Sequence, residues 1–244
     1  MWRRLAWILL LATAPAGADW RSGSAGIVSD YLFRGLDQTN GPALQGSLDY
    51  VRDSGLYAGG WASNNRSAGS GGELDLYGGY SRPVNLFGLV GGSLDAGVQG
   101  YLYSGERGPA LGGGSQDFAE LYAGLSAGPA SLRASFAPDY AGRNAAGWYL
   151  QGTIRYPLWW GLKLRASLGW GLGPGVQRQV APLTDDGRGR PYLDYALRLT
   201  YGLPWWSLDA WAGVAGTSLP LAGSAMGGGD QPKFLAGLVK NFDW

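Results

Sequence analysis

The chain has 244 residues, and its 19 basic and 18 acidic residues nearly balance, which leaves a formal net charge of +1. This balance gives no electrostatic footprint for nucleic acid, so we expect no nucleic-acid partner. Cysteine and histidine are absent, which excludes disulfides and removes the usual general base and the commonest metal ligand. Glycine is frequent at 44 residues, yet 12 Trp and 14 Tyr accompany it. Disordered glycine-rich chains lack aromatics, so the composition favours a folded protein.

Residues 1–18 have the features of a secretory signal peptide. Arg3 and Arg4 form a positive n-region, residues 5–14 an apolar core, and residues 16–18 an A-x-A-like cleavage site. The apolar core is too short to span a membrane as a helix, which takes about 20 residues. We therefore predict export, cleavage after Ala18, and one mature domain over residues 19–244.

Beyond the signal, apolar and polar residues alternate in many short segments. In "GELDLYGGYSR", Leu74 and Leu76 lie on one face while Glu73 and Asp75 lie on the other. A period of two is typical of a β-strand with one apolar and one polar face. About twelve such segments are predicted, at roughly residues 22–34, 42–52, 55–64, 72–82, 89–104, 117–128, 130–141, 147–156, 161–172, 191–202, 205–216 and 232–244.

The connections between these segments alternate in length. Short turns such as "RDSG" and "AGPA" follow even-numbered segments, while longer polar or glycine-rich stretches follow odd-numbered ones. This arrangement is typical of outer-membrane barrels. We therefore predict an all-β fold, a transmembrane antiparallel up-and-down β-barrel of about 12 strands in the outer membrane, with both termini periplasmic. The alternative is a soluble β-sandwich or lipocalin-type barrel, but those folds place the apolar face inward.

Aromatic residues near the segment ends match the two interfacial girdles of a membrane barrel, where a ring is half buried and half wet. These residues are Trp61, Tyr80, Trp148, Tyr156, Trp159, Trp160, Trp170, Tyr201, Trp205 and Trp206.

The last segment ends the chain on an aromatic residue and presents one apolar face, interrupted by Lys240. A strand of this kind resembles the signal that barrels present to their insertion machinery, and pairing with the first strand would leave no open edge in lipid. We expect outer-membrane lipid and the barrel-insertion machinery as partners. The apolar face consists of Phe234, Ala236, Leu238, Phe242 and Trp244.

The polar faces of the predicted strands carry charged residues that we expect to line a pore. Acidic residues dominate the first six segments and basic residues dominate segments seven to ten, with Arg34 and Asp194 the respective exceptions. Because successive strands are neighbours in a barrel, the two sets should line opposite walls and direct a field across the lumen. The alternative is a closed interior in which these charges pair. The candidate pore-lining residues are Asp30, Arg34, Asp49, Glu73, Asp75, Asp95, Glu120, Arg133, Arg155, Lys163, Arg165, Asp194 and Arg198.

Two functional hypotheses follow, and they differ in what fills the lumen. The first is a channel for passive diffusion of small polar solutes or ions, and the second is a sealed barrel with a structural or adhesive role carried by its loops. Twelve strands give a width between filled eight-stranded barrels and open sixteen-stranded porins. Bulky residues on the predicted inner face could narrow it further: Tyr77, Tyr101, Tyr103, Phe118, Tyr122, Tyr149 and Trp211.

The sequence gives little support for an enzymatic function. Glu73 and Asp75 are one pleat apart, about 7 Å, which suits a cation site or an acid/base pair, but a wet lumen wall explains them better. Histidine-dependent triads cannot form without histidine, and none of the three lysines follows a Ser-x-x-Lys spacing. We predict that the protein is not an enzyme and uses no cofactor or metal.

The stretch "SDYLFRGLDQTNGPALQGSLDYVRDSGLYAGGWASNN" at residues 29–65 resembles the TorF porin family of small Gram-negative outer-membrane proteins. Further similarity lies in "ELDLYGGYS" and "ELYAGLS". The resemblance implies an outer-membrane location and a porin role, and it brings no established catalytic or binding residues. Trp244 departs from the family pattern, in which Phe is the usual last residue. The matching positions are Ser29, Asp30, Tyr31, Arg34, Gly35, Gln38, Thr39, Pro42, Ala43, Gln45, Gly46, Asp49, Tyr50, Ser54, Gly55, Tyr57, Gly59, Trp61, Ser63 and Asn64.

Overall fold

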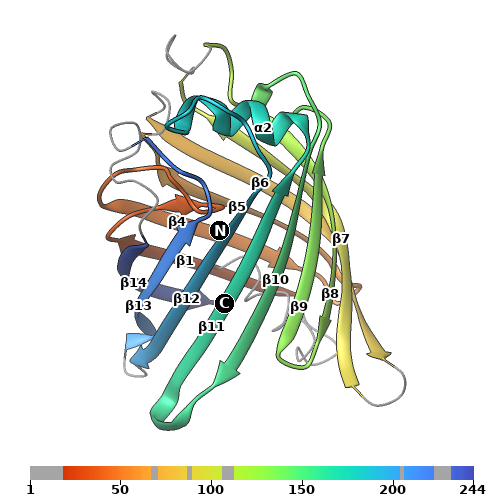
Figure 1. Ribbon diagram of the computed structural model, residues 1–244. Helices are drawn as coiled ribbons and strands as arrows, with labels where there is room; N and C mark the ends of the chain where they lie inside the picture. The colour runs from red at the N-terminus through yellow and green to blue at the C-terminus, as the bar shows by residue number, and fades with distance from the viewer. Residues whose placement is uncertain (1–18, 67–70, 87–89, 106–112, 204–205, 223–231) are drawn as a thin grey trace.

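The computed structural model of the chain describes residues 19–66, 71–86, 90–105, 113–203, 206–222 and 232–244. The predicted signal peptide, residues 1–18, lies outside the described residues, as does Trp205 of the predicted girdle. The described chain forms one barrel of long, tilted strands (Figure 1).

The barrel closes with twelve antiparallel strands, and each strand pairs with its neighbour in the chain. This confirms the predicted fold. The strands are β1 (Trp20–Val28), β4 (Ala43–Val51), β5 (Leu56–Asn64), β6 (Gly72–Leu86), β7 (Val90–Tyr103), β8 (Phe118–Ala127), β9 (Ala130–Ala137), β10 (Gly147–Pro157), β11 (Leu162–Leu172), β12 (Tyr192–Leu203), β13 (Leu208–Thr217) and β14 (Lys233–Asp243).

The first and last strands close the barrel, as predicted. β1 pairs with β14 from Ser22 opposite Asp243 to Val28 opposite Gly237, and its other edge pairs with β4. The amide of Trp244 extends the ladder by donating to the carbonyl of Arg21 at 3.1 Å. No strand of the barrel is therefore left with an unpaired edge.

The two ends of the barrel differ. One end carries short turns, such as the turn in which the Gly55 amide donates to the Arg52 carbonyl at 2.9 Å. The other carries the longer connections, including the helix α2 (Pro174–Val180), which covers part of the rim (Figure 1). The sequence predicted only a loop there. The short 3₁₀ turns are η3 (Tyr140–Gly142), η4 (Trp159–Gly161) and η5 (Ala181–Leu183). Among the described residues, no helix is long and apolar enough to cross a membrane.

Polarity is inverted relative to a soluble protein. On the outer face, Leu44, Leu121 and Phe234 are 68%, 62% and 88% exposed, and large exposed apolar side chains occur on every strand of the barrel except β13. On the inner face, polar side chains such as Asp75 and Glu120 are buried. Exposed apolar surface on this scale marks a surface that water does not normally cover.

Trp61 does not join the predicted outer girdle. Its position in β5 faces inward, where it is 4% exposed and packs edge-on against Tyr31 with 5.2 Å between ring centroids. The prediction was wrong for this residue because strand-end position alone does not say which face a side chain occupies. The alternation of side chains along β5 identifies the face: Ser63, two residues further along, lies on the same face as Trp61 and is also buried.

Candidate functional site in the barrel lumen

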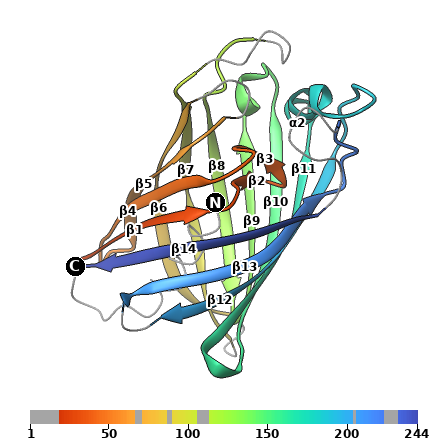
Figure 2. The ribbon, with the colours of Figure 1, turned by 90° about the vertical axis from the view of Figure 1, so that its left-hand side faces the viewer.

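The connection between β1 and β4 folds into the barrel as a small hairpin. It consists of β2 (Leu32–Phe33) and β3 (Leu36–Asp37), with Leu32 opposite Asp37, and Figure 2 shows it inside the wall of strands. The turn is formed by Arg34 and Gly35, both with positive φ (52° and 76°), the conformation of a two-residue type I′ turn. We call residues 31–40 the lumen hairpin.

This hairpin corrects the prediction for the first segment. The sequence predicted one strand over residues 22–34, with Asp30 and Arg34 on its inner face, but the strand ends at Val28. Both residues still lie inside the barrel, on the connection to the hairpin and at its tip. The apolar run "YLF" continues the strand-like pattern, so periodicity could not distinguish wall from hairpin.

Buried contacts hold the tip of the lumen hairpin across the lumen. Arg34 Nη2 lies 2.7 Å from Glu120 Oε2 of β8, and both side chains are 1% exposed. Arg34 Nη1 donates to the Tyr140 hydroxyl at 3.2 Å, and its guanidinium sits 4.1 Å above the ring of Tyr149 from β10. The Tyr192 hydroxyl of β12 donates to the Arg34 carbonyl at 3.1 Å. The tip is therefore tied to three strands.

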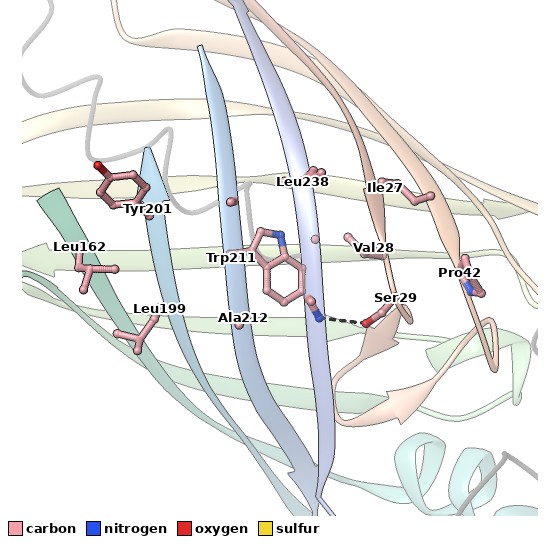
Figure 3. A pocket seen from close by; sticks show the side chains of 13 residues that line it. Ile27, Val28, Ser29, Pro42, Leu162, Leu199, Tyr201, Trp211, Ala212 and Leu238 are labelled. Carbon is pink, nitrogen blue, oxygen red and sulfur yellow. Dashed lines mark hydrogen bonds between the residues drawn. The ribbon is translucent and has the colours of Figure 1, made fainter. Parts of the chain in front are cut away.

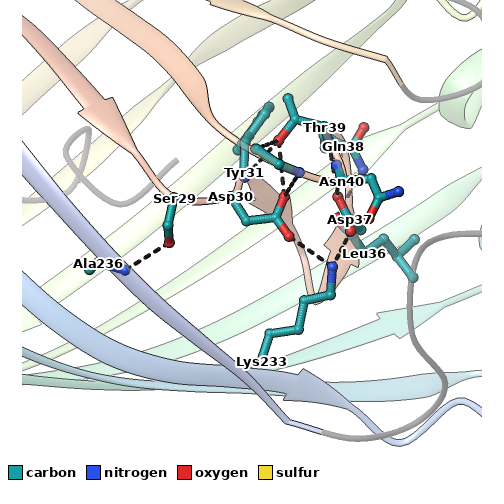
Figure 4. Close-up of polar contacts among 11 residues, drawn as sticks. Ser29, Asp30, Tyr31, Leu36, Asp37, Gln38, Thr39, Asn40, Lys233 and Ala236 are labelled. Atoms are coloured by element: carbon teal, nitrogen blue, oxygen red, sulfur yellow. Dashed lines mark hydrogen bonds and ion pairs between the residues drawn. The ribbon is translucent and has the colours of Figure 1, made fainter.

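A second set of contacts fixes the base of the lumen hairpin (Figure 4). Lys233 of β14 pairs with Asp30 at 2.8 Å and also with Asp37. The Asp37 carboxylate accepts the amides of Thr39 and Asn40 at 2.9 and 2.7 Å. Lys233 and Asp37 were not among the predicted site residues. The alternation of β14 places Lys233 on the inner face with Leu235, and this signal could have identified it.

Aromatic side chains fill the space around the lumen hairpin. Phe33 packs edge-on against Tyr101 at 5.4 Å, and Tyr101 stacks on Phe118 at 4.4 Å between centroids. Tyr140 continues the cluster beside Phe118 at 5.3 Å. These buried rings belong to one apolar cluster inside the barrel, so the end that carries the long connections is narrowed by packed side chains.

The predicted acidic residues of the wall lie on β4, β6, β7, β8 and β12. Apart from Glu120, which binds Arg34, each accepts a hydrogen bond from a neutral side chain. The donor–acceptor pairs are Tyr77 with Asp49, Asn65 with Glu73 (3.1 Å), Gln99 with Asp75 (3.2 Å), Tyr57 with Asp95 (2.7 Å) and Tyr149 with Asp194 (2.8 Å). Glu73 and Asp75 are thus part of a hydrogen-bonded wall, and within the described ranges no cluster of three acidic residues could hold a metal ion.

The predicted basic residues lie on the adjoining arc, β9 to β12. Arg133 places its guanidinium 3.6 Å from the centre of the Tyr122 ring. Arg155, Arg165 and Arg198 are direct cross-strand neighbours on β10, β11 and β12, and Lys163 is exposed near the start of β11. The predicted acidic and basic residues of the wall therefore occupy different arcs, apart from Asp194 on β12.

The wall of the barrel borders a hollow on its outer side and small cavities on its inner side. A hollow of about 640 Å³ lies on the outer side, bordered by apolar side chains such as Leu199, Tyr201 and Leu238 (Figure 3). Inside, two cavities of about 30 Å³ each flank Leu32 of the lumen hairpin, one bordered by Arg165 and the other by Arg198. Each has room for about one water molecule.

Solved structures with the same fold are porins. The KdgM porin matches with a TM-score of 0.57 at 12% identity, covering 91% of this chain and 99% of that chain. The KdgM porin in complex with disordered oligogalacturonate gives 0.53 at 12% identity, covering 92% and 99%. The NanC porin gives 0.54 at 10% identity, covering 90% and 97%. The fold is that of these porin barrels.

A family profile makes the assignment more specific. Residues 12–181 match Gcw_chp, a family described as bacterial proteins of unknown function, and the chain belongs to this family. No curated protein matches the chain by sequence. The resemblance to the TorF family remains a prediction from the motif at residues 29–65.

Proposed function

We propose that the mature protein, residues 19–244, is an outer-membrane porin-like channel for passive diffusion of small polar solutes or ions. The inverted polarity of the barrel carries this proposal. An apolar outer face is stable in lipid, where a closed barrel satisfies its backbone groups internally, and a polar inner face suits water. The porin fold of the structural relatives supports the same function.

The charged residues of the inner wall would line this channel. Apart from Asp194 on β12, they separate into an acidic arc over β4–β8 and a basic arc over β9–β12. This separation supports a field directed across the lumen, which would orient dipolar solutes. The lumen hairpin would form the constriction, because it crosses the lumen from β14 to β8. Only small solutes would pass beside it.

A second function is favoured by the packing of that hairpin. Its tip is ion-paired and surrounded by stacked rings, and the cavities beside it are small. A barrel sealed in this way would serve a structural or adhesive role through its external loops. The two functions differ in whether solutes cross the membrane.

Swelling of proteoliposomes in isotonic sugars separates the two functions. A narrow channel is expected to admit a pentose faster than a hexose and to exclude a trisaccharide, because the constriction limits solute size. Liposomes of the same lipid without protein give the background. Swelling at that background rate for every sugar would contradict the channel and favour the sealed barrel.

A further inference from the structure

Three arginines form a continuous row on the inner wall. Arg155 of β10 is the cross-strand partner of Arg165 of β11, and Arg165 is the partner of Arg198 of β12. Neighbouring strands are about 4.8 Å apart, so the row extends over about 10 Å. We call these three residues the arginine row.

This arrangement brings like charges together in a half-buried setting. Like charges directly opposite each other on neighbouring strands are destabilising. Two hydrogen bonds of the row go to neutral acceptors: Arg155 Nη1 donates to Ser131 Oγ at 3.4 Å, and Arg198 Nε donates to Thr200 Oγ1 at 3.2 Å. Nε and Nη2 of Arg155 are buried and find no acceptor among the described residues. A bound anion would accept hydrogen bonds from these two nitrogens of Arg155 and would offset the positive charge of the three guanidinium groups.

The arginine row lies on the short-turn side of the lumen hairpin. Tyr149 of β10 contacts the hairpin tip, and Arg155 follows six residues later on the same strand, about 20 Å away. The small cavity beside the hairpin tip reaches Arg165. Lys163, two residues before Arg165 towards the short-turn end, is exposed. A ligand that enters through this end therefore meets Lys163 before it reaches the row.

We infer that the arginine row is a binding site for a small oxyanion that carries two or more negative charges. A guanidinium presents paired donors that match the oxygens of carboxylate and phosphate, and it is weakly hydrated for a cation. A row of about 10 Å suits a phosphate or a short dicarboxylate. This inference rests on the proposed function in one respect, since it names the class of solute that the channel would pass. The binding site itself would also exist in a sealed barrel.

Titration calorimetry on the folded protein in detergent micelles tests the site. The probes are inorganic phosphate and succinate at constant ionic strength, with acetate as the comparison of lower charge. Arg165→Gln removes the middle of the row, and Arg82→Gln removes an exposed arginine near the end of β6 as the matched control. We expect the wild type and the control to bind phosphate or succinate saturably and more tightly than they bind acetate. The affinity of Arg165→Gln for phosphate or succinate should be about 10- to 100-fold weaker.

Thermal unfolding gives a second readout that does not depend on a channel. Phosphate or succinate should raise the unfolding temperature of the wild type and of Arg82→Gln, but not of Arg165→Gln. Without added oxyanion, Arg165→Gln should be at least as stable as the wild type, because the substitution relieves repulsion. Equal affinities in the two variants, or no saturable binding by the wild type, would overturn the site. If the protein binds the oxyanions but the proteoliposomes do not swell, the channel is contradicted and the site is retained. If the proteoliposomes swell but no oxyanion binds, the site is contradicted and the channel is retained.

Discussion

At the scale of single residues, Arg34 and Gly35 determine how the lumen hairpin is built. A non-glycine residue with positive φ is strained, and Arg34 is held there by its contacts with Glu120 and Tyr140. A Cβ on Gly35 would lie 2.6 Å from the Cβ of Asp194 and 3.0 Å from the carbonyl of Gly216, so only glycine fits the tip against the wall.

Glu120→Gln is expected to destabilise the folded protein by about 3–5 kcal/mol, because it leaves the buried guanidinium of Arg34 without its ionic partner. Urea unfolding in detergent micelles measures the change. Asp186→Asn is the control: it breaks the Arg190–Asp186 pair, whose side chains are about 40% exposed, and should leave stability unaltered. A Glu120→Gln protein as stable as this control would show that the ion pair does not hold the hairpin.

At the scale of elements, the wall was predictable and the lumen hairpin was not. Alternation alone placed Arg155, Arg165 and Arg198 on one face of their strands, because the side-chain period of a strand is two. The hairpin depends on contacts that alternation does not encode, such as the ion pair between Asp30 and Lys233, which are 203 residues apart. Sequence periodicity therefore identifies strands but gives no sign of a connection that turns inward.

Because the chain has no cysteine, single cysteines can report where the lumen hairpin lies. We expect Leu36→Cys to resist a bulky maleimide reagent in the folded protein, since Leu36 is 5% exposed. Ser115→Cys, at an exposed position of a long connection, should react fully, and both should react after denaturation. Rapid labelling of folded Leu36→Cys would mean that the hairpin leaves the lumen.

At the scale of the whole molecule, the barrel combines an apolar outer face with a lumen that the hairpin crosses. The ends of the hairpin connection are adjacent, because Val28 and Ala43 are cross-strand partners. A two-residue turn of Asn-Gly in place of residues 30–41 can therefore join β1 to β4 without changing the wall. This variant is expected to keep the barrel and to lack the lumen hairpin.

Single-channel conductance in planar bilayers, compared between the wild type and this hairpin-replacement variant, tests the channel most directly. The barrel is expected to give small, discrete current steps in the wild type and steps several-fold larger in the variant, since removing the constriction widens the path for ions. Both proteins must first show the heat-dependent shift in gel mobility of a folded barrel. Absence of current from both folded proteins at every voltage would contradict a channel through this lumen.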